Sequence, residues 1–354
     1  MSAEGHSSAT SGPATLVVVL ALSVALLTGA ACPDADQIPA EGSDDGMPVL
    51  RRAALAGKET AYSAVREVTG PEGADPPPHV RVVHRPGDGL ALAPVGGEGS
   101  AFVVRASSAL ESLDERLLHM LEDTYEVTDA GTAVLDGREA RVVEAGRSDG
   151  TVAGRFWVDA GTDLLVGSTV YEVSGEAALS VRLTGLEQGG GDWPEGAAGG
   201  TPWGDALTGD ERAALREEGW TLPEHLDWNL RLVDARSTEH SGRRVVHAVY
   251  SDGLSQVSVF TQRGKLGAEH SPSLRDGYAG TDTGGNGVTT QHDTIFGGDV
   301  GQYQSMWQAD GFVYTVLADA PVGIASSAVT ALPGPEGSGF WGRVHRGMSR
   351  LGFL

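Results

Sequence analysis

The sequence predicts an α+β protein in which antiparallel sheets are covered by helices. Stretches of alternating apolar and polar residues recur along the chain, and Asp-Gly pairs separate several of them. Such pairs tolerate the positive φ that tight hairpin turns require. A long amphipathic helix interrupts the strands. Glycine is abundant, with 51 among 354 residues, and this favours turns and strands over a helical bundle.

The N-terminal half is expected to contain one short helix and a series of strands. The helix is predicted over residues 47–56. The strands are predicted at 61–69, 79–84, 90–95, 101–105, 132–135, 140–145, 151–159, 164–173 and 178–186. In the strand GRFWVD, Phe156 and Val158 should face one side of the sheet and Trp157 the other. We therefore expect one apolar face and one solvated face.

The apolar face needs a cover, and the segment 108–125 is the natural candidate. Ser108 and Glu111 have the spacing of a capping box, which satisfies free N–H groups in the first turn. Its leucines fall on one helical face; they are Leu110, Leu113, Leu117 and Leu121. An apolar stripe of this kind usually packs against the protein's own sheet.

A second domain is predicted after a Gly- and Pro-rich linker at 188–205. Its helix should begin at Thr208, which has a capping pattern with Glu211, and end at Gly219. The remaining elements are a strand at 229–236, a hairpin of 243–251 with 254–263, a polar loop at 264–301 whose role is open, a hairpin of 302–308 with 311–318, and a helix at 322–332. The pairs Asp252-Gly253 and Asp310-Gly311 are the expected turns of the two hairpins.

The N-terminus carries an export or anchoring signal. Residues 14–31 are apolar and uncharged, and Cys32 follows them directly. Three interpretations stay open: cleavage before Cys32 with lipid attachment, ordinary cleavage nearby, or a retained membrane helix. Each places the remainder outside the cytoplasm. Residues 1–32 are thus a signal peptide or anchor, and 33–46 an acidic disordered tether.

Charge and composition exclude several classes of protein. Asp and Glu number 48 against 25 for Lys and Arg, a net charge of −23, so a phosphate backbone would repel the chain and no nucleic acid is expected. One cysteine permits neither an internal disulfide framework nor a Cys-based zinc site. The tail at 334–354 mixes arginines with aromatics, and it either touches a membrane surface or packs on the protein.

The sequence carries no catalytic pattern in the context that catalysis needs. It has no His-Glu-x-x-His and no phosphate-binding Gly-Lys-Ser/Thr loop, and its Gly-x-Ser-x-Gly match at Gly146–Gly150 falls on a predicted hairpin turn. The histidines occur singly, without metal-ligand spacing. Ser-Asp-Gly occurs at Ser148 and Ser251, where hairpin turns account for it better than a nucleophile beside an acid. We expect no enzyme activity, no metal and no cofactor.

Three segments resemble the RseB/MucB regulators of extracytoplasmic sigma factors, in an actinobacterial-type version. They are YEVTDAGTAVLDGREARVVEAGRSDGTVAGRFWVDAGTDLLVGSTVYEVSG at 125–175, the stretch 219–260, and MWQADGFVYTVLADAPVGIASSAVTALP at 306–333. The short YSDGL within the second is the family's best signature. These motifs serve turns and packing, and they span both predicted domains.

The resemblance implies a curved, unclosed antiparallel sheet, like half of a barrel in lipoprotein carriers, with helices on its concave side at 47–187. A smaller α/β domain follows at 206–333. It also implies binding to the extracytoplasmic region of a membrane anti-sigma factor, relieved by an envelope-stress ligand that is lipidic in the better-known members. An apolar ligand cavity would then be lined by Phe102, Leu113, Leu117, Leu121, Phe156 and Val158.

The hairpin at Tyr250, Ser251, Asp252 and Gly253 is the candidate for binding the protein partner, because an exposed strand edge can accept an extended chain. The ordinary alternative is a pair of core strands joined by a turn. A different function for the same fold is a lipid or lipoprotein carrier of the cell envelope. Either protein would lie at the outer face of the cytoplasmic membrane.

Overall fold

The computed structural model describes residues 44–70, 79–95, 102–104, 113–189, 191–194, 204–226, 229–240, 242–265 and 303–334. All of them belong to one compact unit, Ile38–Leu354. The predictions for the export signal, Cys32, the loop at 264–301 beyond residue 265 and the tail beyond residue 334 lie outside the described residues.

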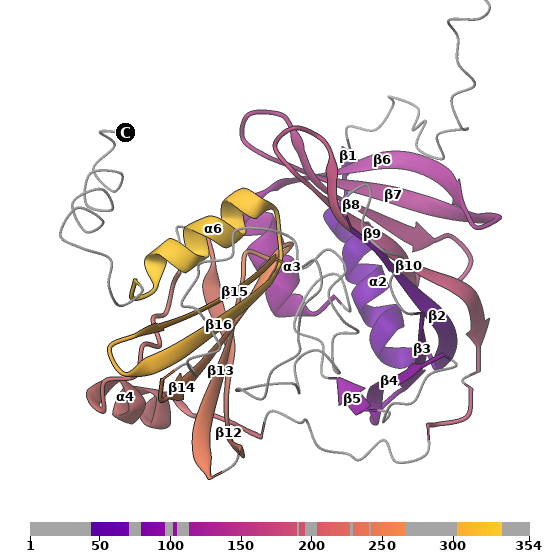
Figure 1. Cartoon of the computed structure of the whole chain (residues 1–354). Helices are drawn as coiled ribbons and strands as arrows, with labels where there is room; N and C mark the ends of the chain where they lie inside the picture. The colour runs from indigo at the N-terminus through magenta and orange to yellow at the C-terminus, as the bar shows by residue number, and fades with distance from the viewer. Residues whose placement is uncertain are drawn as a thin grey trace, which may run out of the picture. The chain divides into compact units, whose positions relative to one another are not determined.

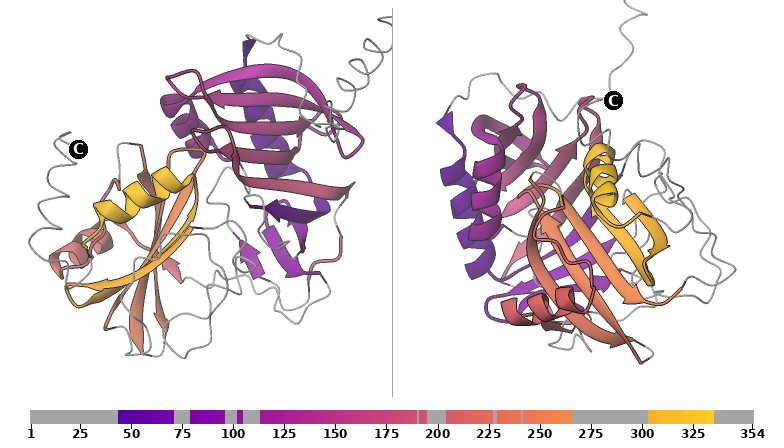
Figure 2. Two further views of the ribbon diagram at one scale, coloured as in Figure 1. Left: turned by 45° about the horizontal axis from the view of Figure 1, so that its top comes forward. Right: turned by 90° about the vertical axis from the view of Figure 1, so that its left-hand side faces the viewer.

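The first sheet has ten strands in the order β1-β6-β7-β8-β9-β10-β2-β3-β4-β5. Every neighbouring pair is antiparallel. The strands are β1 Asp44–Asp45, β2 Tyr62–Thr69, β3 Val80–Arg85, β4 Gly89–Pro94, β5 Phe102–Val104, β6 Glu126–Leu135, β7 Arg138–Gly146, β8 Val152–Asp159, β9 Leu165–Tyr171 and β10 Ala177–Gln188. The sheet bends around helix α2, Met47–Glu59, without joining its two edges (Figures 1 and 2). The predicted curved, unclosed sheet is therefore observed.

Two helices cover the concave face of this sheet. Helix α2 buries Met47, Val49, Leu50 and Ala53, and α3, Glu115–Thr124, packs beside it. Their side chains share one apolar cluster with Phe156 and Val158 of β8, so this face is the apolar one, as predicted.

Helix α3 is shorter than the predicted segment 108–125. It begins after Asp114, whose carboxylate accepts a hydrogen bond from the Leu117 amide at 2.7 Å. A carboxylate at this position satisfies a free N–H group and complements the helix dipole. The proposed capping box of Ser108 and Glu111 lies outside the described residues.

The prediction of a solvated opposite face was wrong at β8. Trp157 does point away from Phe156, but it is buried in a second apolar cluster with Leu135, Val142 and Val166. Arg155, which hydrogen-bonds Glu144 at 2.6 and 2.9 Å, also lies over the Trp157 ring, 6.0 Å from its centroid. The aliphatic parts of long charged side chains, held in place by ion pairs, can cover apolar surface in this way.

The second sheet has six strands in the order β11-β12-β13-β14-β16-β15. They are β11 Asp205–Ala206, β12 Arg231–His240, β13 Arg243–Ser251, β14 Gln256–Arg263, β15 Tyr303–Ala309 and β16 Phe312–Asp319. Helices α4, Gly209–Glu217, and α6, Val322–Ala331, contribute to the apolar cluster on one face of this sheet. The capping box of Thr208 with Glu211 is present as predicted.

Two of the predicted Asp-Gly turns have the expected geometry. Asp136-Gly137 has φ values of 48° and 75°, and Asp310-Gly311 has 52° and 79°. Both residues of each pair thus adopt the left-handed region that a two-residue type I′ turn needs.

The predicted two-residue turn at Asp252-Gly253 is wrong. Ser251 pairs with Gln256, so four residues form the loop, and only Gly253 has a positive φ, 96°. Asp252 closes the loop itself by accepting hydrogen bonds from the amides of Leu254 and Ser255 at 2.9 and 2.6 Å. These hydrogen bonds form an Asx turn, which closes the loop without a positive φ at Asp252.

The predicted tether at 33–46 also ends too late. Asp44 and Asp45 form β1, which pairs with Asp129 and Thr128 of β6. The Asp45 carboxylate then accepts a hydrogen bond from the Met47 amide at 2.9 Å, at the start of α2.

Candidate functional site

A groove runs between α2 and α3 on the concave side of the first sheet. Its volume is about 880 Å³, within the range of ligand pockets. Apolar groups from α2, α3, β2, β4 and the residues just before α3 form much of its wall; they include Ala54, Leu55, Tyr62, Leu90, Leu113 and Leu118. We refer to this space as the α2–α3 groove.

Two ring side chains place polar atoms in the groove wall. Tyr62 and His84 stack with centroids 5.3 Å apart. The His84 Nδ1 lies 2.7 Å from the Thr60 carbonyl oxygen, so Nδ1 carries the proton and donates to that oxygen. The Nε2 atom is then an acceptor in the neutral ring. Burial raises the pKa of Tyr62 to about 12, so its hydroxyl stays a donor.

Charged side chains lie at the rim of the groove and belong to both helices. Arg51 of α2 pairs with Glu122 of α3 at 2.9 Å, and both side chains are about half exposed. An exposed pair of this kind contributes little stability, roughly 0–1 kcal/mol. The two helices are therefore bridged across the rim by a contact that costs little to break.

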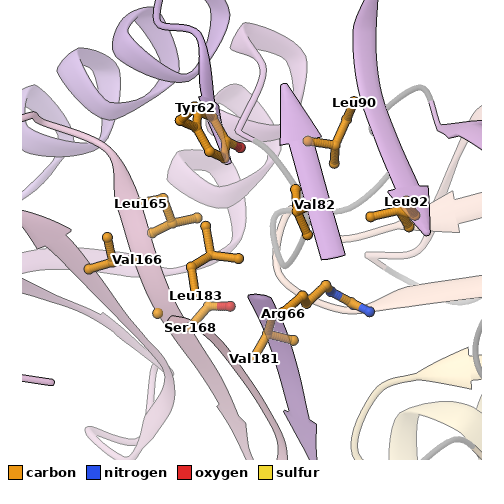
Figure 3. A pocket seen from close by; sticks show the side chains of 11 residues that line it. Tyr62, Arg66, Val82, Leu90, Leu92, Leu165, Val166, Ser168, Val181 and Leu183 are labelled. Atoms are coloured by element: carbon orange, nitrogen blue, oxygen red, sulfur yellow. The ribbon is translucent and has the colours of Figure 1, made fainter. Parts of the chain in front are cut away.

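Figure 3 shows a smaller, largely apolar pocket of the first sheet. Its volume is about 20 Å³. Tyr62 and Leu90 line both this pocket and the groove. Figure 3 shows Tyr62 and Leu90 toward one end of the ring of lining residues, with Arg66 and Ser168 at the other. We refer to this space as the inner pocket.

The loop after β13 is docked on α3. The Tyr125 hydroxyl donates a hydrogen bond of 2.7 Å to Asp252 Oδ2. Burial raises the pKa of the Asp252 carboxyl above its usual range. The pKa of Tyr125 is also raised, first by burial and then by the Asp252 charge.

Packing around this loop leaves no room for larger residues. A Cβ on Gly253 would lie 2.7 Å from Leu121 Cα and 2.9 Å from the Leu117 carbonyl oxygen. Leu254 belongs to the same apolar cluster as Phe156, and a Cβ on Gly154 would lie 2.5 Å from its Cδ1. We call residues 252–255, together with Tyr125, the clasp.

Other contacts support the clasp. Arg231 of β12 pairs with Asp123 of α3 at 3.0 Å, and Arg116 of α3 donates to the Val233 carbonyl. Met120 of α3 forms an apolar cluster with Val233 and Val249. Helix α3 therefore contacts the second sheet along several turns, while other residues of the same helix line the groove.

The predicted cavity residues mostly lie in the packed core. Leu117, Leu121, Phe156 and Val158 are fully buried and border neither described cavity. Leu113 does line the α2–α3 groove. The side chain of Phe102 lies outside the described residues, although its backbone is in β5. The ligand-lining role of these six residues remains a prediction.

The predicted partner-binding residues are buried as well. Tyr250 donates to the Pro223 carbonyl oxygen at 2.9 Å, and Ser251 donates to the Ser255 carbonyl oxygen at 2.8 Å. Asp252 and Gly253 belong to the clasp. The partner-binding role of this hairpin remains a prediction. Sequence reasoning missed Tyr125, Tyr62, His84 and Arg66. Only the adjacent Leu254, an apolar residue in a turn, could have indicated a docked loop.

No cluster of three or more His, Cys, Asp or Glu residues suited to a metal ion occurs among the described residues. In the same part of the chain, no helix combines the length and apolar character needed to cross a membrane.

The chain is similar to solved structures of MucB. In the crystal structure of MucB in complex with MucA(peri), identity is 18%, the match covers 83% of this chain and 100% of MucB, and the TM-score is 0.47. The Pseudomonas aeruginosa MucA/MucB complex gives 17%, the same coverages and 0.47. A LolA superfamily protein from Nitrosomonas europaea gives 11% identity over 43% of this chain and 96% of that protein, with a TM-score of 0.21.

No protein-family model matches the chain, and no curated protein matches it. Likenesses at these identities and TM-scores carry no inference about activity. The fold class rests on the strand order and helix packing described above.

Proposed function

We propose that this protein is an extracytoplasmic regulator that binds the extracytoplasmic region of a membrane anti-sigma factor and releases it when an apolar ligand occupies the α2–α3 groove. Two things support the proposal: the sequence resemblance to RseB/MucB regulators, and the position of α3. This one helix lines the groove through Leu118 and Glu122, and it holds the clasp through Leu121.

Ligand binding and partner binding can be coupled through that helix. A ligand between α2 and α3 would contact α3 side chains directly, because those side chains form part of the groove wall. Gly253 of the clasp lies directly against the backbone of α3. A small shift of the helix therefore changes how the clasp packs on it. A ligand that favours the shifted form would move the population away from the form that binds the partner.

The test is a pull-down with the ectodomain of a single-span anti-sigma factor from the source genome, with the neutral amphiphile oleyl alcohol as the probe. We expect the purified chain to retain the ectodomain and oleyl alcohol to release it. The variant Ala54→Phe should fill the groove and leave retention insensitive to oleyl alcohol. Val173→Phe, which adds the same ring at an exposed position outside the groove, serves as the matched control.

Failure to retain the ectodomain by a folded chain would contradict the proposal. The alternative function, a lipid or lipoprotein carrier at the cell envelope, is favoured by the size of the groove. It predicts a different result: co-purification of stoichiometric lipid with no retention of the ectodomain.

A further inference from the structure

The inner pocket contains a charged side chain whose pairing is incomplete. Arg66 projects from β2 on the same face as Tyr62 and Ala64, and it lines the pocket. Its Nε atom is buried and has no hydrogen-bond partner. A buried donor left without an acceptor costs about 1–3 kcal/mol, more when the group is charged. Such a group indicates a missing acceptor.

Among the residues that the structure describes, none in the wall of the inner pocket supplies a counter-charge to Arg66. Its cross-strand neighbours are Leu183 and Val80. None of the eleven residues that line the pocket is acidic. The rest of the wall is apolar except for the hydroxyls of Tyr62 and Ser168. In a protein with a net charge of −23, an arginine facing an apolar hollow without a carboxylate is an exception that calls for an anionic ligand.

The size of the pocket restricts what that anion can be. A volume of about 20 Å³ is close to the room that one water molecule needs. A carboxylate is small and planar enough to enter with modest side-chain movement, and a guanidinium binds it through two parallel hydrogen bonds. A phosphodiester with its glycerol is too bulky for this space.

The groove provides the space for the rest of such a ligand. Tyr62 and Leu90 border both cavities, and Arg66 with Ser168 lies at the far end of the inner pocket (Figure 3). A ligand that lies in the groove and extends past Tyr62 and Leu90 would bring its head group to Arg66. The apolar part of the groove wall, with Leu55 and Leu118, can then contact the hydrocarbon tail.

We infer that the inner pocket binds the carboxylate of a long-chain fatty acid through Arg66 and Ser168, with the acyl chain lying in the α2–α3 groove. This inference rests on the proposed function only for the identity of the groove as a ligand site. It assigns the ligand a single negative charge and a fixed orientation, with the carboxylate inside.

The experiment compares the affinities of the whole chain for oleate and for methyl oleate by displacement of a neutral fluorescent probe, 1-N-phenylnaphthylamine. The wild-type chain should bind oleate at least ten times more tightly than the ester. Arg66→Gln should lose most of this preference while binding methyl oleate as before, and Arg66→Lys should keep part of it. Arg81→Gln is the matched control, because Arg81 is an exposed arginine on the neighbouring strand β3 that lines neither cavity.

Equal affinity of the wild-type chain for acid and ester would overturn the inference, and so would an unchanged ratio in a folded Arg66→Gln variant. Tighter binding of oleoyl lysophosphatidic acid than of oleate would also overturn it, by showing that the head group is a phosphate. These outcomes are separable from the proposed function. A chain that releases its partner with oleyl alcohol but shows no acid preference retains the proposed function and loses this inference. A chain that prefers oleate but never retains the ectodomain retains this inference and loses the proposed function.

Discussion

The same Asp-Gly pair serves two different purposes in the second sheet. At Asp310-Gly311, both residues take left-handed φ values and a Cβ on the glycine would meet open space. At Asp252-Gly253, the glycine lies against the backbone of α3 and the aspartate is buried. The first pair is needed only for its local conformation. The second is needed for what it touches, so the two should respond very differently to substitution.

The largest difference is expected between Gly253→Ala and Gly311→Ala. A methyl group at residue 253 would lie 2.7 Å from Leu121 Cα, so α3 or the loop must move, at a cost of about 3 kcal/mol of unfolding free energy. At residue 311 only the left-handed backbone is disfavoured, which costs about 1 kcal/mol. Urea unfolding of both variants measures these values. Equal losses would mean that the clasp does not form in solution.

A smaller difference is expected between Asp252→Ala and Asp310→Ala. The first removes the acceptor of three hydrogen bonds and leaves the Leu254 and Ser255 amides without their partner, for a loss of about 2 kcal/mol. The second changes an exposed residue, with a loss of about 1 kcal/mol from its left-handed φ. Thermal unfolding compares the two. A loss at residue 252 no greater than that at residue 310 would show that these bonds add no stability.

The smallest effect is a pH dependence that only residue 252 should produce. Burial raises the pKa of Asp252 in the folded protein, so the folded state binds this proton more tightly than the unfolded state. The resulting stability is fully present below the ordinary carboxyl pKa of about 3.9 and is lost as the pH rises through the folded value. Asp252→Asn has nearly the same shape and does not titrate.

The free energy of unfolding of the wild-type chain, minus that of Asp252→Asn, should therefore fall as the pH rises above the ordinary carboxyl pKa of about 3.9. Asp310→Asn provides the reference, since Asn tolerates the left-handed region and residue 310 is exposed. A difference that is constant with pH, or that rises, would contradict a raised pKa at Asp252.

Several elements could be predicted from the sequence because their causes are local. The hairpin of β15 and β16 follows from period-two alternation and a turn pair with the correct φ preference. The start of α4 follows from a capping box that needs four consecutive residues. The alternation of Phe156 and Trp157 was also predicted, but the burial of Trp157 was not. That burial depends on Val142 and Val166, which come from neighbouring strands.

The walls of the two described cavities could be predicted less fully than the fold. The six residues chosen for a ligand cavity share apolar character, and apolar character alone does not distinguish a core from a cavity wall. Leu113 lines the groove, whereas Leu117, four residues later, is in the core. Arg66 carries no local signal at all. Its surroundings become apolar only when β3, β4, β9 and β10 bring their side chains to the same pocket.

By itself, the sequence determined the turn between β15 and β16 and the start of α4, and it determined that the first sheet would have a covered apolar face. These features depend on residues a few positions apart. The tertiary structure alone decided that loop 252–255 docks on α3, through a bond between residues 127 positions apart, and that Arg66 faces an apolar hollow. Burial raises the pKa of Asp252 and leaves Arg66 Nε without a partner only after distant strands and helices have packed together.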